Sequence, residues 1–458
     1  MSTVAVPSRA PRPGSPTPSA GALQKAAHHG VRWWYAVLVA IMAWGLAAWI
    51  DELNVGLAAT GMRDVVSWGI YIFTFAFFIG LSAGGLIMAS SAEVFGIKAL
   101  KPLSRLGVLS AAACVSVAAL MIIPDLGQPF RILNLFVHPN WSSPLVWDIL
   151  IITVYFVFSV VDLTVLHRHA RADAEEGHGT RAARLRTVVR VLAYVGLPTA
   201  VLLHSVTAWI FGVQIARAWW NTSLMAPLFV VSAVLSGTAL VTLLALLAER
   251  FGKVSLPEET RRWLRGFIVV SLFIDLFFVG ADYITMLWGN VPSERSALNL
   301  VLPGGSWSWL FWLEWIVGGL VPLALLLVPR LRRQQWSLWA AALLAMVGVY
   351  AFRIELVVVG FVNPLTQFPP GNALGTYNPS ASSFQLVGAY HPTWVEYGIV
   401  AGLAGLFAAI VTVGYRRLDV MGTAVGAGPL LGPPPADAAS RREPQVPEPG
   451  ALGASVAS

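Results

Sequence analysis

The stretch at residues 197–212, LPTAVLLHSVTAWIFG, decides the fold class, because it is apolar enough to lie within a lipid bilayer. With its flanks it forms a run from Val188 to residue 213, longer than the roughly 20 residues that a membrane-spanning helix needs. His204 lies inside this run, about 12 Å from its outer end at about 1.5 Å per residue. An imidazole at that depth either bonds a neighbouring helix or belongs to a functional site.

The composition extends this interpretation to the whole chain. The 458 residues are 57% hydrophobic and 12% charged, with a mean hydropathy of +0.70, whereas soluble proteins are roughly 25% charged. These values predict an integral membrane protein whose partner is the lipid bilayer. The net charge of +7 is explained by membrane topology. The basic loops lack interleaved aromatic residues, so we expect no nucleic-acid partner.

Ten apolar segments predict an all-α fold with ten transmembrane helices. They cover residues 33–50, 67–92, 106–123, 147–166, 188–213, 225–248, 266–288, 307–328, 336–358 and 394–414. Residues 1–32 and 416–458 are rich in Pro, Ser and Ala and predict disordered tails. The N-terminal tail has no apolar core of a signal peptide, so we expect it to be retained.

Lysine and arginine predict the orientation. Both tails and the loops after even-numbered spans hold 25 of the 30 basic residues, and the alternate loops hold only Arg63, Arg131, Arg217 and Arg295. Basic residues concentrate on the cytoplasmic side. We therefore expect both termini to be cytoplasmic and the protein to lie in the inner (cytoplasmic) membrane.

Several other ionisable residues fall within or at the ends of the spans. Charges inside a bilayer are costly, so such groups face the bundle interior and mark functional pathways or structural pairs. We predict a proton pathway from Glu93, Asp162, Asp275, Asp282, Glu314, Arg353 and Glu355.

Simpler explanations remain for several of these residues. Arg353 can form a purely structural ion pair with one of the acids. Glu93 and Asp162 lie at inner helix ends, where contacts with loops explain them equally well. Asp282 lies near the outer end of its span and can be solvated from outside.

The chain offers few ligands for redox cofactors. Cys114 is its only cysteine, which is too few for an iron–sulfur cluster, and His204 is its only histidine within a span. A membrane b-type haem usually needs two such histidines. We therefore expect no haem and no iron–sulfur cluster in this polypeptide, and no metal site.

Two spans share a pattern that predicts an internal repeat. Residues 77–96, FFIGLSAGGLIMASSAEVFG, and 230–252, VVSAVLSGTALVTLLALLAERFG, both contain Leu-Ser and end in Glu-x-Phe-Gly. We predict two parallel four-helix bundles, at 67–213 and 214–358. The first span with its loop (33–66) and an outer loop with the last span (359–415) lie outside them.

A series of motifs carries a family resemblance. In order they are GLSAGG (80–85), PDLGQPFR (124–131), SPLVWD (143–148), the stretch around His204, MAPLFVVSAVLSG (225–237) and YHPTWVEYG (390–398). Together they resemble the NrfD-like, or polysulfide-reductase membrane-subunit, family, most closely its long, ten-span branch. The resemblance covers about residues 35–415.

The resemblance implies a cofactor-free subunit that exchanges electrons between membrane quinone and an iron–sulfur subunit on the outer face. That partner would connect to a catalytic subunit, a molybdopterin enzyme or a hydrogenase. It also implies that His204, on the motif that contains Trp209, binds the quinone head group. Relatives carry an aspartate after this tryptophan where this sequence has Ile210, so the acid that assists His204 stays open.

The chemistry of quinone binding adds Tyr71 as a donor to the second quinone oxygen, and Asp125 and Arg131 as residues that cover the pocket or dock the partner. An interfacial aromatic, loop capping and a surface ion pair explain these three equally well.

Two other functions remain as alternatives. The acids and Arg353 of the second bundle could form an ion or proton carrier, since repeated bundles with buried charges are common in transporters. The protein could also be a passive membrane anchor for an extracytoplasmic enzyme.

Overall fold

A computed structural model describes residues 20–63, 65–176, 179–252, 255–363, 389–418 and 420. Over these residues the chain forms helices and no strand, and ten helical segments are long and apolar enough to cross a membrane. The predicted all-α class and the ten predicted spans are therefore confirmed, and the chain is a multi-pass integral membrane protein.

Nine spans begin with one long helix each. They are α1 (Ala20–Val55), α2 (Ile70–Val94), α3 (Lys101–Asp125), α5 (Pro144–Glu176), α6 (Thr180–Gly212), α7 (Met225–Gly252), α8 (Glu258–Gly289), α13 (Gln335–Ile354) and α15 (Trp394–Arg417). The eighth span consists of α10 (Ser308–Phe311), the π-helical η4 (Trp312–Leu320) and α11 (Val321–Leu327). After α13, the ninth span continues through the π-helical η5 (Glu355–Val359) and α14 (Gly360–Val362).

Short helices lie in the connections. They are η1 (Leu57–Ala59), η2 (Lys98–Leu100), η3 (Pro129–Leu133), α4 (Asn134–Val137), α9 (Pro292–Val301) and α12 (Pro329–Arg332). The outer end of the molecule is the end that carries η1, α4 and α9, which the basic residues predict to face away from the cytoplasm.

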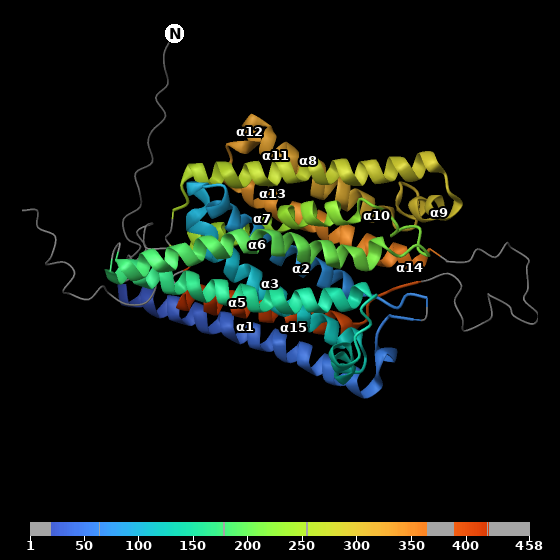
Figure 1. The fold of residues 1–458 in the computed structure, drawn as a ribbon, viewed down its shortest axis with the longest axis horizontal. Helices are drawn as coiled ribbons and strands as arrows, with labels where there is room; N and C mark the ends of the chain where they lie inside the picture. The colour runs from blue at the N-terminus through green and yellow to red at the C-terminus, as the bar shows by residue number, and fades with distance from the viewer. Residues whose placement is uncertain are drawn as a thin grey trace, which may run out of the picture.

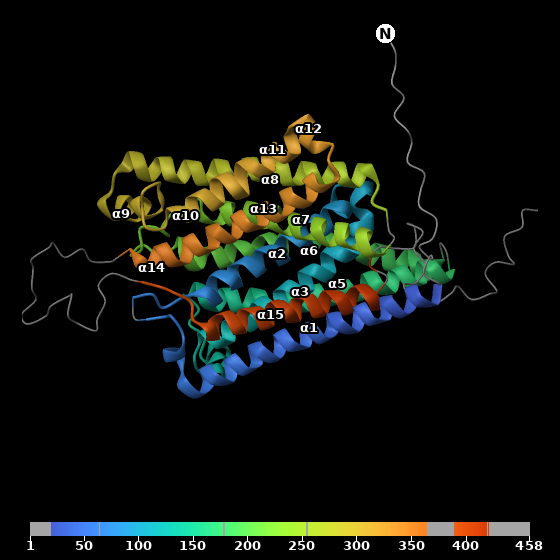
Figure 2. The ribbon, with the colours of Figure 1, turned by 180° about the vertical axis from the view of Figure 1, so that it is seen from behind.

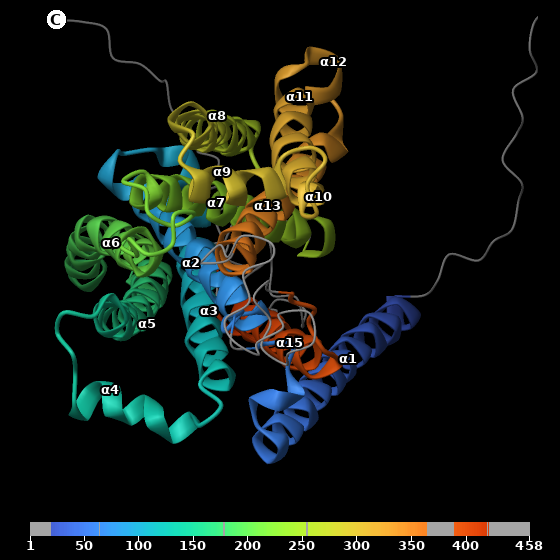
Figure 3. The same cartoon turned by 90° about the vertical axis from the view of Figure 1, so that its right-hand side faces the viewer.

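The long helices lie side by side along one direction (Figures 1 and 2). Helices α2, α3, α5 and α6 pack around one another, and α7, α8, α13 and the η4–α11 segment form a second group. Viewed along the helices, α2 and α7 lie in the middle and α1 packs against α15 at one edge (Figure 3). The first and last spans thus form a pair that contacts the rest through α3 and α2.

Helices α2 and α7 cross at glycines. A Cβ atom on Gly84 would lie 1.8 Å from the carbonyl oxygen of Ala233, and one on Gly237 would lie 2.4 Å from the backbone of Gly84. Small residues allow such backbone contact between membrane helices. Both glycines follow the Leu-Ser pairs of the predicted repeat, so its two copies meet along this crossing.

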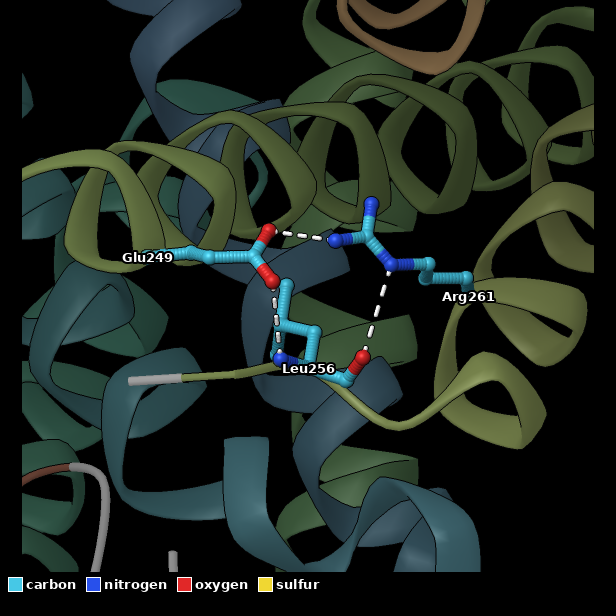
Figure 4. Close-up of polar contacts among 3 residues, drawn as sticks. All are labelled: Glu249, Leu256 and Arg261. Carbon is cyan, nitrogen blue, oxygen red and sulfur yellow. Dashed lines mark hydrogen bonds and ion pairs between the residues drawn. The ribbon is translucent and has the colours of Figure 1, made fainter. Parts of the chain in front are cut away.

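The second shared motif closes an inner loop in each half. Glu249, near the end of α7, pairs with Arg261 of α8 and accepts a 3.0 Å hydrogen bond from the Leu256 amide (Figure 4). Glu93, near the end of α2, pairs with Lys101 of α3 at 2.9 Å. Each glutamate therefore joins the end of one helix to the start of the next, which gives Glu93 a structural explanation.

The helix ends differ from the predicted span ends. Helix α1 begins at Ala20 rather than at residue 33, so residues 20–32 are helical where a disordered tail was predicted. Helices α5 and α6 likewise extend beyond their predicted inner ends, because polar residues continue a helix outside lipid as readily as apolar ones. Residues 1–19 and 421–458 of the predicted tails and 364–388 of the predicted outer loop lie outside the described residues.

We expect Gly84→Ala to destabilise the protein, because the added methyl group forces α2 and α7 apart. Overpacking of this kind costs about 1–3 kcal/mol or more. Gly266→Ala is the matched control, since a Cβ there meets nothing within 4 Å, and it should leave the stability unchanged or slightly raised. Thermal unfolding followed by size-exclusion chromatography in detergent would compare them, and equal unfolding midpoints would contradict the close crossing.

Candidate functional site

His204 lies near the middle of the membrane-spanning region, where the two helix groups meet. Its ring is fully buried, 3.4 Å from where a Cβ on Gly80 of α2 would lie, and its centroid is 5.1 Å from that of Phe229 on α7. Gly80 is ten residues into α2, about 15 Å along the axis, and His204 is eight residues before the end of α6, about 12 Å. A larger residue at position 80 would press on the imidazole.

The Nε2 atom of His204 lies 3.2 Å from an Nη2 nitrogen of Arg353 on α13. A guanidinium carries only N–H donors. The contact therefore requires a lone pair on Nε2, which assigns the proton of the neutral ring to Nδ1. No described residue accepts a hydrogen bond from Nδ1. The histidine thus holds a buried N–H donor without a partner.

Arg353 is itself fully buried. Its Nη2 donates a 2.6 Å hydrogen bond to Oγ of Ser232, and its guanidinium carbon lies 3.8 Å from the ring centroid of Phe229. The Nε and Nη1 groups have no partner among the described residues. The negative charges that act on this guanidinium are those of Asp275 and Glu314. Arg353 therefore contacts the histidine directly and interacts with these two acids through its charge, without an ion pair to either one among the described residues.

The acids come from three different spans. Asp275 lies on α8, Glu314 in η4 and Glu355 at the start of η5, and all three are buried. Tyr283 donates a 2.5 Å hydrogen bond to Glu355. Both carboxyl oxygens of Glu314 are buried without a hydrogen-bond partner among the described residues, and its carboxyl lies near that of Glu355.

The two glutamates share an unusual backbone. Each lies in a π-helical segment, a wider turn that is rare in proteins and often found at functional sites. Pro322, just after η4, lacks an N–H, so the carbonyl of Gly318 loses its usual helical donor. We call His204, Asp275, Glu314, Arg353 and Glu355 the central cluster.

A second group of polar side chains lies at the outer end, between α1, α2, α3 and α15. Tyr71 of α2 donates a hydrogen bond to Glu52 of α1. Glu396, in the first turn of α15, accepts a 2.6 Å bond from the Tyr390 hydroxyl and another of 2.6 Å from the Gly61 amide. The charges of Glu52 and Glu396 both act on Asp125, at the end of α3. We call Glu52, Tyr71, Asp125, Tyr390 and Glu396 the outer cluster.

Tyr390 joins two distant parts of the chain within this cluster. Its hydroxyl also accepts a 2.6 Å hydrogen bond from the amide of Ile70, at the start of α2. Burial and the neighbouring carboxylate of Glu396 raise the pKa of Tyr390 far above its usual value. The hydroxyl therefore keeps its proton at physiological pH and remains a donor to Glu396.

The predicted quinone-binding residues thus fall into separate places. Tyr71 and Asp125 belong to the outer cluster, and His204 to the central cluster. Tyr71 is nine residues before Gly80 on α2, about 13 Å along the helix, and its hydroxyl bonds Glu52 rather than a residue of the central cluster. Arg131 lies exposed in η3, and Trp209 is 38% exposed on α6, outside both clusters.

The predicted proton-pathway residues divide as well. Three acids and Arg353 meet in the central cluster. Asp282 lies two turns nearer the outer end of α8 and accepts a 2.8 Å hydrogen bond from Thr222. Glu93 is held in its ion pair with Lys101, and Asp162 is buried on α5 beside Tyr155. Neither of these two belongs to the central cluster.

Three buried acids were not predicted from the sequence. Glu52 and Glu396 lie at the outer ends of α1 and α15, where a hydropathy pattern places residues in solvent. Asp148, the last residue of the motif SPLVWD, accepts a 2.6 Å bond from Thr207, one turn outward from His204 on α6. Asp148 directly follows Trp147, so the motif SPLVWD was the signal in the sequence that could have identified this buried acid.

The described residues do not form a metal-binding cluster. Over the ranges that the structure describes, no three His, Cys, Asp or Glu side chains lie close enough together to hold one. The chemistry that the clusters offer is hydrogen bonding and proton transfer.

The family comparison agrees with this architecture. The model of the family described as polysulphide reductase, NrfD matches residues 58–364. The chain belongs to the NrfD family. The matched range contains the central cluster in full and excludes α1 and α15.

Several curated relatives of this NrfD-family protein are membrane subunits. A Halobacterium salinarum protein, named as a candidate dimethyl sulfoxide reductase membrane subunit, is 35% identical over 85% of this sequence and 91% of its own length. The menaquinone reductase integral membrane subunit of Nitratidesulfovibrio vulgaris is 24% identical over 84% and 91%. A polysulfide reductase polypeptide of Wolinella succinogenes is 25% identical over 65% and 95%.

In this NrfD-family protein we expect Tyr390→Phe to lower the stability, because it removes the donor to Glu396 and the acceptor of the Ile70 amide. Unsatisfied buried groups cost about 1–3 kcal/mol each. Tyr397→Phe is the matched control, since Tyr397 is 52% exposed on α15. Thermal unfolding of the two variants should differ by several degrees, and an unchanged midpoint for Tyr390→Phe would contradict the described network.

Proposed function

We propose that this protein is the quinone-reactive membrane subunit of a respiratory oxidoreductase complex in the inner membrane. Two electrons pass between a membrane quinone and an iron–sulfur subunit on the outer face, which serves a catalytic subunit. The basic residues support the orientation, with both termini cytoplasmic. The names of relatives, among them a menaquinone reductase subunit and a menaquinol oxidoreductase subunit, support the substrate class.

One observation carries the assignment of the site, namely the unpartnered Nδ1–H of His204. A buried donor without an acceptor costs free energy unless a ligand supplies the acceptor. The carbonyl oxygen of a quinone is such an acceptor. Because the ring of His204 is fully buried, binding requires the side chains packed around it to move apart. Arg353 holds Nε2 and so keeps the donor on Nδ1.

The proton balance follows from this arrangement. Reduction of a quinone consumes two electrons, which come from the iron–sulfur partner, and two protons. His204 donates its Nδ1–H to a carbonyl oxygen as a hydrogen bond and stabilises the negative charge that the electrons bring to it. Both protons come from water by way of the buried acids. Oxidation of a quinol reverses each transfer: two electrons leave to the iron–sulfur partner, and two protons leave to water by way of the same acids.

The two ring nitrogens can be separated by substitution. His204→Asn places an amide near the position of Nδ1, whereas His204→Gln places it near Nε2. We expect His204→Gln to raise the KM for quinone about tenfold or more, which corresponds to about 1.4 kcal/mol, and His204→Asn to retain more affinity. Steady-state kinetics of the intact complex with a short-chain quinone would measure both.

Leu202→Ala is the control for this pair, since Leu202 is exposed on the same helix, and it should behave as the wild type does. Equal kinetics for His204→Gln and the wild type would reject the site assignment. Full activity through a separate cytochrome, with no reaction with quinone, would instead support a passive anchor.

The central cluster also supports proton translocation coupled to the redox reaction. Glu314 lies near Glu355, and the guanidinium of Arg353, which contacts His204, interacts through its charge with Glu314 and Asp275. The acids thus continue from the proposed quinone site into the second helix group. An independent ion carrier would use the same residues without His204.

We expect Glu314→Gln to reduce the number of protons moved per electron more than it reduces uncoupled turnover. Proteoliposomes containing the purified complex and an internal pH dye would measure this ratio. Glu258→Gln is the control, because Glu258 lies in an exposed ion pair with Arg265. Turnover by the wild type without any pH change beyond the scalar chemistry would rule out translocation.

A further inference from the structure

An apolar cavity lies between the first and last spans and α3. It has a volume of about 220 Å³, and its walls come from Met42–Trp49 of α1, Leu120–Pro124 of α3 and Ile399–Leu406 of α15. Leu46 and Leu120 are exposed on the surface that lipid covers. The cavity therefore receives its occupant from the bilayer.

The outer end of this cavity meets the outer cluster. Trp49 lines the cavity and Glu52 lies about one helical turn further outward on α1, while Pro124 lines it and Asp125 follows directly. The Oδ1 atom of Asp125 and the indole N–H of Trp49 are both buried without a hydrogen-bond partner among the described residues. An acceptor and a donor thus stand unused where the apolar cavity ends, and buried polar groups in native proteins rarely lack partners.

The charges near Asp125 and Trp49 decide whether the ligand is charged or neutral. The groups that act on Asp125 are the carboxyls of Glu52 and Glu396, and no cation is among them. A phospholipid phosphate is anionic and is repelled by such a site. A neutral lipid that carries hydroxyl or carbonyl groups on a ring meets no such penalty, since its hydroxyl donates to Asp125 and a carbonyl accepts from Trp49.

We propose that the outer cluster and this cavity form a second binding site for a quinone or quinol, apart from the one at His204. The ring lies against Asp125 and Trp49, and the first part of the isoprenoid tail fills the cavity. The volume is below the roughly 300–1,000 Å³ of pockets that enclose a whole drug-sized ligand. The remainder of the tail therefore stays in the bilayer.

This second site is built mainly from parts of the chain outside the family match. Helix α1 supplies the wall residues from Met42 to Trp49 and α15 those from Ile399 to Leu406, and both helices lie beyond residues 58–364. Along the axis of α2, the second site lies at the depth of Tyr71. Gly80, which lies beside His204, is about 13 Å further along the same helix. The identity of the ligand rests on the proposed function, but its position does not depend on His204.

The test uses the intact complex and an azidoquinone with a short isoprenoid tail, activated by light. We expect the probe to label peptides of α1 around Met42–Trp49 or of α15 around Ile399–Leu406, and unlabelled quinone to compete with it. Leu120→Trp fills the cavity and should reduce this labelling at least fivefold. Asp125→Leu, which removes the acceptor, should also reduce it.

Leu150→Trp is the matched control, because Leu120 and Leu150 are both 37% exposed and Leu150 lies on α5, away from the cavity. It should leave the labelling unchanged. Labelling that is absent from α1 and α15, that persists in Leu120→Trp, or that is displaced by phospholipid but not by quinone would overturn the proposal.

The second proposal can be separated from the first in the same complex. If both proposals hold, His204→Gln raises the KM for quinone in turnover, and the probe still labels α1 or α15. If His204→Gln keeps full turnover while the cavity is labelled, the assignment of His204 fails and the second site stands. If turnover depends on His204 and the cavity is unlabelled, the second site fails alone.

Discussion

The contact between Arg353 and His204 is the interaction on which the interior of this protein depends. It joins residues 149 apart in the sequence, one from each helix group. Because a guanidinium only donates, it fixes the tautomer of the imidazole and leaves Nδ1–H free. It also brings a permanent positive charge among acids that would otherwise be alone in a low-dielectric interior. The same arginine therefore fixes which nitrogen of the histidine carries the proton, and it reduces the cost of burying the acids nearby.

The backbone adapts to hold these groups. Membrane helices normally satisfy every main-chain group internally, yet two π-helical segments occur here, each carrying a buried glutamate. A wider turn changes the direction in which the following side chains point, and Glu314 and Glu355 lie near each other although they come from different spans. The glycine crossing of α2 and α7 brings the two helix groups close enough for Arg353 to reach across.

The sequence predicts the fold well because hydrophobicity and the distribution of basic residues act locally. All ten spans follow from their apolar length, and the five residues of the central cluster were recognisable as ionisable groups inside spans. Their grouping was not predictable, since His204 and Arg353 were assigned to different functions and only a contact between bundles joins them. Glu52 and Glu396 were missed because a buried acid at a helix end looks like a solvated one. The pairing of α1 with α15 likewise has no local signal.

The outer cluster has a consequence for how the protein is made. Its hydrogen bonds connect residues 335 and 320 apart in the sequence, Gly61 with Glu396 and Ile70 with Tyr390. The first helices enter the membrane long before the last one is synthesised, and long-range contacts form late. Until α15 arrives, the amides of Gly61 and Ile70 lack the partners that Glu396 and Tyr390 supply. Assembly of this corner therefore reports that the whole polypeptide has been inserted, and a partner subunit that docks there would select finished molecules over truncated ones.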